Sequence, residues 1–429
     1  MGTMWKRSML SKASVLTTAL VLTTGTAAIA RPAYATDWGS AAVAIFEVGA
    51  QYAYLSRQVH YLDNEGRHEY MDQIKDKYGV NEDPAANAML DRLMGRLSTS
   101  IAAQEPKSTI GTQPYEYFVN NERSFNAFCT LGHNVSVNIG AFQKLNYNED
   151  EMAFVLGHEL AHGEKRHPAR GVTRGLPISL IAALYASQNP NAASYIGATL
   201  LNAVGTAKLV TKPMESQADK LGFDYAVGAG YNVGGGAALW QRIVERNGNG
   251  GGGFGELFND HPRSISRRDT YSKRITKWSN NKVKVNADTG EVLVHGKPFL
   301  TPEDTDSMSG KERAYLIAGN LAAVFHDPDK EPGAVTNDGN VLMVGKQPIM
   351  TWDGVSDPAA TQARLTTLLQ GKGHGEEDKD SVKKDAKEKK VKKDKKTVRE
   401  ERVKADKEKK DQVKADKAAA KTVKADKTH

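Results

Sequence analysis

The chain has 429 residues, which exceeds the length of about 250 to 300 residues at which a single hydrophobic core usually stops growing, so several domains are expected. Its formal net charge is +7, but 22 of the 58 basic and 14 of the 51 acidic residues lie in residues 371–429. The other 36 basic and 37 acidic residues nearly cancel, which excludes the basic surface of a nucleic-acid-binding domain. The single cysteine, Cys129, excludes an intramolecular disulfide.

The N-terminus has the pattern of a secretory signal peptide over residues 1–35. Lys6 and Arg7 precede a run of apolar and small residues, and Ala33-Tyr34-Ala35 fits a small-x-small cleavage site. We therefore expect export across the inner membrane to the periplasm or cell envelope. An uncleaved membrane anchor is the alternative, although the apolar run is short for a bilayer span.

Helical spacing of apolar residues predicts scaffold helices over residues 38–62 and from Asp83 to Leu97. Alternating residues then predict strands at 115–119 and 135–139, joined by a turn at Gly132-His133-Asn134. A small sheet is thus expected to precede the next helix, which covers residues 149–167 and ends before Pro168. Two apolar stretches, 178–186 and 195–210, are too short to span a bilayer and predict a core hairpin.

The helix over 149–167 contains His158-Glu159-Leu160-Ala161-His162. Residues four apart lie one helical turn above each other, so both imidazoles can bind one metal ion. Glu159 is placed to take a proton from a metal-activated water. Surface histidines on an ordinary helix are the alternative, but the apolar neighbours indicate a buried helix.

A catalytic metal site needs a third protein ligand and an open position. A HExxHxxGxxH arrangement is excluded because Lys165 and Pro168 occupy its glycine and histidine positions, and His167 is out of register. The better candidate is Glu215, which follows Pro213 at the start of another predicted helix. Asp219 lies one turn further on and can accept the distal N–H of a ligating histidine, preferably His158.

Residues 283–370 are expected to form a separate small α+β module. The segment from Gly290 to Pro298 is echoed from Gly339 to Pro348, and each copy precedes a helical stretch, which suggests two ββα units or a chance similarity of two hairpins. After residue 370 the composition reduces to Lys, Asp, Glu, Ala and Val, which predicts a disordered tail. This tail either only improves solubility or binds anionic envelope polymers or membrane surfaces.

The HELAH segment together with Glu215-Ser216-Gln217-Ala218-Asp219 resembles the HExxH and ExxxD pair of gluzincin metalloproteases of the HtpX and CAAX-prenyl-endopeptidase type, particularly their soluble periplasmic members. Asn126-Ala127-Phe128 and His261-Pro262 with Arg267 are similar to two further family segments. The resemblance covers residues 83–277.

This resemblance implies one Zn²⁺ per chain, held by His158, His162 and Glu215, with Glu159 as general base. It also implies that the strand containing Val135, Ser136 and Val137, preceded by Asn126, is the edge to which a peptide substrate adds. His261 would stabilise the oxyanion or cover the metal as a removable ligand, or it is a structural helix cap. Asp219 and Arg267 would support the ligands.

We therefore expect an α+β protein with a mainly helical zincin-like domain at 36–280, the module at 283–370 and the tail at 371–429. Its expected function is zinc-dependent endoproteolysis of unfolded or misassembled envelope proteins. A non-enzymatic adaptor or holdase with a closed metal site is one alternative. A cysteine hydrolase using Cys129 and His133 is another, weaker one.

Overall fold

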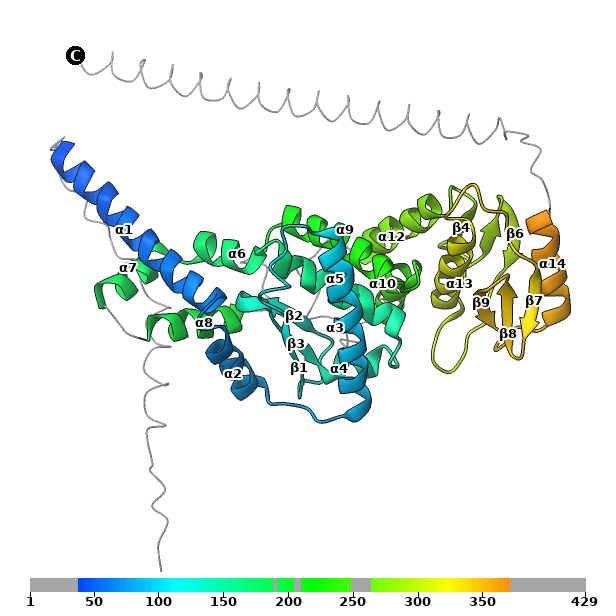
Figure 1. The fold of residues 1–429 in the computed structure, drawn as a ribbon, viewed down its shortest axis with the longest axis horizontal. Coiled ribbons are helices and arrows are strands. Elements are labelled where there is room, and N and C mark those ends of the chain that lie inside the picture. The colour runs from blue at the N-terminus through cyan, green and yellow to red at the C-terminus, as the bar shows by residue number, and fades with distance from the viewer. Residues whose placement is uncertain (1–37, 188–190, 204–209, 248–263, 371–429) are drawn as a thin grey trace, which may run out of the picture.

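The computed structural model describes residues 38–187, 191–203, 210–247 and 264–370 (Figure 1). It confirms a mostly helical α+β fold with small three-stranded sheets. The elements are distributed along the long axis of the molecule, from α1 at one end to α14 at the other (Figure 1). The predicted signal peptide, the Lys-rich tail and His261 lie outside the described residues.

The helices are α1 (Trp38–Asp63), α2 (Arg67–Tyr78), α3 (Pro84–Gln104), α4 (Ile139–Lys144), α5 (Glu149–Glu164), α6 (His167–Gly175), α7 (Ile178–Ser187), α8 (Ala192–Ala203), α9 (Lys212–Gly228), α10 (Gly235–Asn247), α12 (Ser264–Trp278), α13 (Gly310–Val324) and α14 (Pro358–Gln370). A 3-10 turn, η1, covers Leu131–His133. The strands are β1 (Glu116–Asn120), β2 (Ala127–Thr130), β3 (Asn134–Asn138), β4 (Val283–Val285), β5 (Val292–Val294), β6 (Lys297–Leu300), β7 (Val335–Asp338), β8 (Val341–Val344) and β9 (Gln347–Thr351).

Helix α3 begins where the sequence predicts. The Asp83 side chain accepts a hydrogen bond from the Ala86 N–H at 2.8 Å. Pro84 has no N–H, which suits the first turn, where N–H groups have no partner within the helix. Leu90, Leu93 and Leu97 then recur at helical spacing and are fully buried. They belong to the main core, which also contains the apolar side chains of α5 and α9.

The first sheet has the strand order β1-β3-β2. β1 pairs with β3 in parallel, and β2 pairs antiparallel with the other side of β3. The sequence prediction found β1 and β3 but missed β2, which lies between them in the sequence. The predicted turn at Gly132 therefore joins β2 to β3 and not β1 to β3. The sheet lies beside α5, on the side where β2 is the outer strand.

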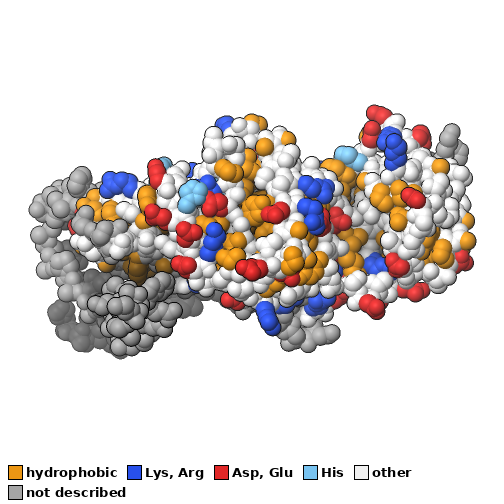
Figure 2. All heavy atoms as spheres, turned by 60° about the horizontal axis from the view of Figure 1, so that its bottom comes forward, with side chains coloured by type: hydrophobic (Ala, Val, Ile, Leu, Met, Phe, Trp, Pro, Cys, Tyr) orange, Lys and Arg blue, Asp and Glu red, His pale blue; other side chains and the backbone are white. Residues whose placement is uncertain are grey.

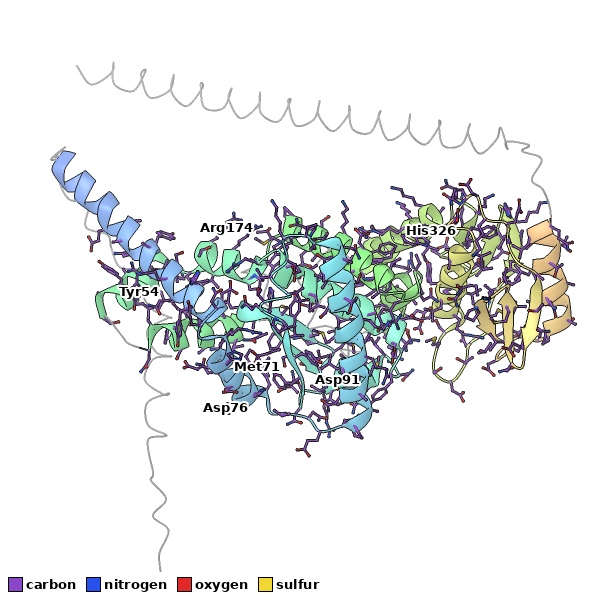
Figure 3. All side chains as sticks on the ribbon, in the orientation of Figure 1. Tyr54, Met71, Asp76, Asp91, Arg174 and His326 are labelled. Carbon is purple, nitrogen blue, oxygen red and sulfur yellow. The ribbon has the colours of Figure 1, made fainter. Side chains whose placement is uncertain are left out.

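Helices α1, α7 and α8 form an arm at one end of the molecule, and Tyr54 on α1 lies far from His326, near the other end (Figure 3). A second apolar cluster, in which Leu55, Ile181 and Ile196 are buried, packs the arm against α2 and the first sheet. Tyr54 also contacts Tyr185 edge to face, with ring centroids 5.7 Å apart. Within the described ranges, no helix has the length and apolarity required to cross a bilayer.

Residues 283–370 contain two successive units of similar construction. Three antiparallel strands, β4-β5-β6, precede α13, and three more, β7-β8-β9, precede α14. Each central strand has a register shift at the same place, after Val292 in one copy and after Leu342 in the other. Each unit thus has one strand more than the expected ββα unit.

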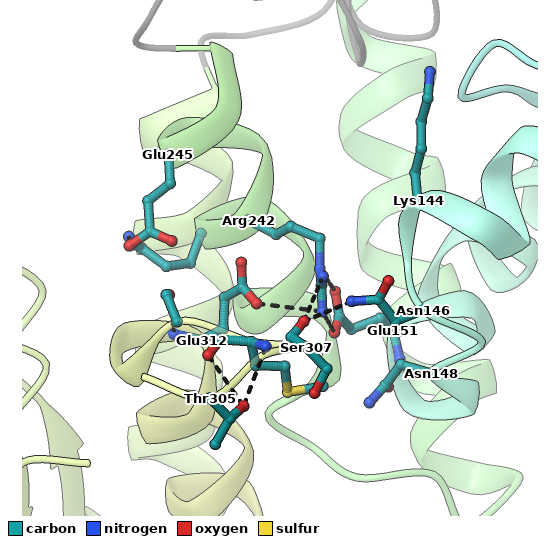
Figure 4. A network of polar contacts seen from close by, with 12 residues as sticks. Lys144, Asn146, Asn148, Glu151, Arg242, Glu245, Thr305, Ser307 and Glu312 are labelled. Carbon is teal, nitrogen blue, oxygen red and sulfur yellow. Dashed lines mark hydrogen bonds and ion pairs between the residues drawn. The ribbon is translucent and has the colours of Figure 1, made fainter. Parts of the chain in front are cut away.

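The hydrophobic core continues from the α5 region into these residues, and both Leu156 and Tyr315 belong to it. A buried ion cluster crosses the same interface (Figure 4). Arg242 on α10 donates two hydrogen bonds of 2.8 Å to Glu151 on α5, and its Nη2 lies 3.2 Å from Oε2 of Glu312 on α13. One guanidinium therefore joins the helix that carries His158 and His162 to the C-terminal units.

On the face in Figure 2, acidic and basic side chains are interspersed, and neither sign forms a continuous field. This agrees with the near cancellation of charge before residue 371. The visible surface therefore has no extended basic footprint.

The cluster around Arg242 predicts a pH dependence of stability. Burial raises the pKa of Glu312 to about 8, against the opposing charge of Arg242, from an ordinary value of 4.5. Between these values the folded chain keeps a proton that the unfolded chain has lost, so stability falls as pH rises, by on the order of 1 kcal/mol per pH unit. We expect the melting temperature to fall more steeply from pH 6 to 8 in the wild type than in Glu312→Gln.

The exposed carboxylate of Glu331 supplies the matched control, because Glu331→Gln should leave the wild-type slope unchanged. Identical slopes for Glu312→Gln and the wild type would show that Glu312 does not titrate in this window.

Candidate metal centre

Helix α5 is defined at both ends by local interactions. The Asn148 side chain accepts from the Glu151 N–H at 2.9 Å, and the acidic first turn suits the positive end of the helix dipole. The helix ends at Glu164, and Arg166 adopts a left-handed conformation with φ 51°. His158 and His162 lie one turn apart on this helix, and both are buried.

Two glycines allow α9 to approach α5 closely. A Cβ on Gly157 would lie 2.7 Å from the carbonyl oxygen of Gly222, and a Cβ on Gly222 would lie 2.6 Å from the backbone nitrogen of His158. Any side chain at either position would therefore separate the helices. This contact brings Glu215, in the first turn of α9, to the imidazoles of α5.

The three predicted ligands converge. The Nε2 atoms of His158 and His162 lie 3.1 Å apart. Glu215 places Oε2 3.4 Å from Nε2 of His158 and Oε1 3.5 Å from Nε2 of His162. Ligand atoms bound tetrahedrally at 2.0–2.1 Å are separated by about 3.3 Å, so this donor set fits a small divalent cation such as zinc.

The electrostatics of the centre also favour a cation. Burial alone would lower the pKa of His158, but its contacts with Asp219 and Glu215 outweigh burial and raise that pKa to about 10. The surroundings thus stabilise positive charge between the imidazole and the two carboxylates. A divalent ion at this point receives the same stabilisation without a proton on the ring.

Asp219 lies behind His158, on the side away from Glu215. Its Oδ1 is 3.1 Å from Nδ1 of His158, and it also accepts a hydrogen bond from Nη2 of Arg267. Burial opposes the charge on Asp219, but Arg267 and His158 outweigh it and lower the pKa of Asp219 to about 2. The Arg267 guanidinium stacks on the Trp240 ring, with Cζ 3.8 Å from the centroid. These contacts orient the His158 ring through a fixed carboxylate.

Glu159 is buried beside the ligands. Burial is the largest of several effects on its carboxyl group, and together they raise its pKa to about 7. The backbone N–H of Cys129 on β2 donates to this carboxylate. A hollow of about 230 Å³, which includes space open to solvent, lies next to it. Its described lining is mostly apolar and comprises Phe154, Val155, His158, Glu159, Leu239, Trp240, Arg267 and Tyr271. Glu159 therefore has the proton affinity and surroundings of a general base.

The predicted substrate edge is wrong for Val135, Ser136 and Val137. These residues lie on β3, which is the central strand and is paired on both sides. A central strand has no free edge to which a peptide can add. The outer strand next to α5 is β2, and Asn126 directly precedes it.

The Cys129 thiol and the His133 ring do not form an activated pair. Burial raises the pKa of Cys129 well above its usual range, so the nucleophilic thiolate is disfavoured. His133 instead stacks on Tyr115 with ring centroids 4.5 Å apart, and its Nδ1 lies 2.9 Å from the Gln113 carbonyl oxygen. These contacts favour a structural role for both residues.

One residue near the centre was missed by the sequence reasoning. His167 is completely buried, and its Nδ1 lies 3.0 Å from Nδ1 of His162. Its spacing excluded it as a ligand, and no other sequence signal assigned it a partner.

Residues 84–275 match the model of peptidase family M48. The beta-barrel assembly-enhancing protease of Escherichia coli is 26% identical over 172 residues, which cover 38% of this chain and 34% of the relative. A Vibrio cholerae protein provisionally given the same name is 28% identical over 186 residues, or 41% of this chain and 36% of the relative.

The mitochondrial metalloendopeptidase OMA1 of Arabidopsis thaliana is 28% identical over 154 residues, or 36% of this chain and 30% of the relative. The chain thus spans about a third of the length of the curated relatives it matches. The similarity concerns the region that contains the His158, His162 and Glu215 cluster.

The helix contact predicts the effect of added bulk. Gly222→Ala must displace backbone atoms of α5, so we expect a loss of roughly 1–3 kcal/mol of stability and weaker metal binding, because Glu215 moves with α9. Thermal unfolding and a metal competition titration measure the two effects.

Gly95→Ala in α3 is the matched control, because nothing lies within 4 Å of its Cβ position. It should stabilise the protein by roughly 0.5–1 kcal/mol without changing metal affinity. Equal metal affinity in Gly222→Ala and Gly95→Ala would show that the close helix contact does not position Glu215.

Proposed function

We propose that the protein is a zinc-dependent endopeptidase that cuts unfolded or misassembled proteins of the cell envelope. Two findings support this proposal: residues 84–275 match peptidase family M48, and His158, His162 and Glu215 form a cluster that can hold a metal ion. The observation that carries this proposal is the convergence of two imidazoles and one carboxylate beside the buried Glu159. The three ligands found among the described residues leave a coordination position for the reaction, whereas structural zinc sites close with four protein ligands.

Zinc suits the donor set because two nitrogens and one carboxylate oxygen are typical of catalytic zinc sites. When bound, the ion lowers the pKa of water and polarises the substrate carbonyl. Glu159 lies next to His158 in sequence and beside the ligands in space. It would accept the proton of the attacking water and deliver it to the leaving amine. His261 remains the proposed oxyanion or gating residue, and its position is outside the described residues.

The substrate would bind as an extended strand along β2, which replaces β3 in this role. β2 is the outer strand of its sheet, and its Cys129 N–H reaches Glu159. The Oδ1 atom of Asn126, just before β2, is buried and makes no hydrogen bond within the described part of the chain. A peptide added here would run past the ligands. Because this mode needs extended backbone, it favours unfolded substrates over folded ones.

The envelope location is proposed from the secretory pattern of residues 1–35 and from the beta-barrel assembly-enhancing protease that the chain resembles. A substrate class of misassembled envelope proteins follows from the same resemblance. The Lys-rich tail remains a proposed contact with anionic envelope surfaces.

Glu159→Gln tests the mechanism. We expect the variant to bind one zinc ion per chain, because the ligands are intact, but to digest unfolded casein roughly 10²–10⁴-fold more slowly than the wild type. Elemental analysis and a casein digestion assay, with and without chelator, measure both quantities.

Glu164→Gln, on the same helix, is the control and should keep wild-type activity, since its amide oxygen can still accept from Tyr115. Digestion by Glu159→Gln at the wild-type rate would refute the assigned base. A zinc-loaded wild type that binds casein without cutting it would instead support the adaptor.

A further inference from the structure

His167 and Gln217 extend the contacts of one proposed ligand. Nδ1 of His167 lies 3.0 Å from Nδ1 of His162, and Nε2 of His167 lies 3.1 Å from Oε1 of Gln217 on α9. The contact with His162 is on the side of that ring opposite Nε2, the atom that faces Glu215. His167 is therefore behind the ligand and does not belong to the ligand cluster of the described residues.

The arrangement permits a single consistent placement of protons. If Nε2 of His162 binds the metal, its Nδ1 carries hydrogen and donates. Nδ1 of His167 must then accept, which places the hydrogen of a neutral His167 ring on Nε2. This N–H donates to the Gln217 side-chain oxygen, which is an acceptor only. The chain of contacts thus fixes the tautomers of both rings.

The backbone explains how a residue five positions after His162 reaches it. On a continuous helix the two side chains would point about 140° apart. The helix stops at Glu164, and Arg166 turns the chain back with φ 51°. Two ion pairs hold this turn in place: Lys165 lies 2.8 Å from Glu105, and Arg166 pairs with Asp63. His167 is thereby held in place by contacts outside the centre.

We propose that His167 is a positioning residue that fixes the ring orientation and tautomer of His162, with Gln217 completing the contact chain. The inference rests on the proposed zinc function. It gives the two histidine ligands different supports: His158 is held by the carboxylate of Asp219, and His162 by a neutral imidazole. A neutral partner avoids another buried carboxylate in a centre that already contains Glu159, Glu215 and Asp219.

The test compares zinc dissociation constants, obtained by competition with a chromophoric chelator, for His167→Leu and His167→Asn. Leucine cannot accept from His162, so we expect zinc binding roughly 10–100-fold weaker than in the wild type. Asparagine places an oxygen near the position of Nδ1 and should restore the affinity to within roughly threefold. Gln217 is exposed, so water can replace it, and Gln217→Ala should have a smaller effect than His167→Leu.

Thermal unfolding of the metal-free proteins separates positioning from a merely structural role. We expect His167→Leu and His167→Asn to melt within a few degrees of each other, so that a difference in zinc affinity reflects the lost acceptor. Nitrogen chemical shifts of the zinc-loaded wild type should show hydrogen on Nδ1 of His162 and on Nε2 of His167.

A wild type that binds zinc with an affinity unchanged by His167→Leu, or one in which asparagine and leucine weaken binding equally, would overturn this inference and leave the proposed enzyme intact. A well-folded wild type that binds no zinc would overturn both.

Discussion

The close packing of α5 on α9 is the constraint on which the centre depends. The backbones meet at Gly157 and Gly222, where neither position has room for a side chain. Two histidines on one helix can be specified by spacing alone, but the third ligand comes from a helix that starts fifty residues later in the chain. Its carboxylate reaches the imidazoles only because the helices approach to backbone contact. Ligand geometry is thus a property of the helix interface.

Much of this centre could be predicted because its information is local. The four-residue spacing of His158 and His162 defines a shared helical face, and that of Glu215 and Asp219 defines another. Capping by Asp83 and the proline before Glu215 likewise mark helix starts within a few residues. The alternation of helices and short strands was enough for the fold class. Each of these features depends on residues separated by one or two turns.

The parts that the sequence could not provide depend on contacts between distant segments. Strand order is one example: β2, which lies between β1 and β3 in sequence, was not revealed by the pattern, and in the sheet it covers the other side of β3 and becomes the outer strand. His167 is another example, because its contact with His162 requires the left-handed turn at Arg166. Arginine rarely adopts this conformation, so nothing in the sequence indicates the turn. The extra strand in each C-terminal unit, β4 or β7, lies before the repeated segments 290–298 and 339–348 on which the prediction was based.

The interface between the α5 region and the C-terminal units at residues 283–370 limits how such chains can recombine. Arg242 is enclosed between Glu151 on α5 and Glu312 on α13, so the buried guanidinium has its full set of polar partners only when both sides of this interface are present. Recombination that exchanged the C-terminal units for an unrelated partner would leave a buried guanidinium facing an unmatched surface. The two parts are therefore expected to be inherited together, and a hybrid protein would need a new residue at 242 before it could tolerate a different neighbour.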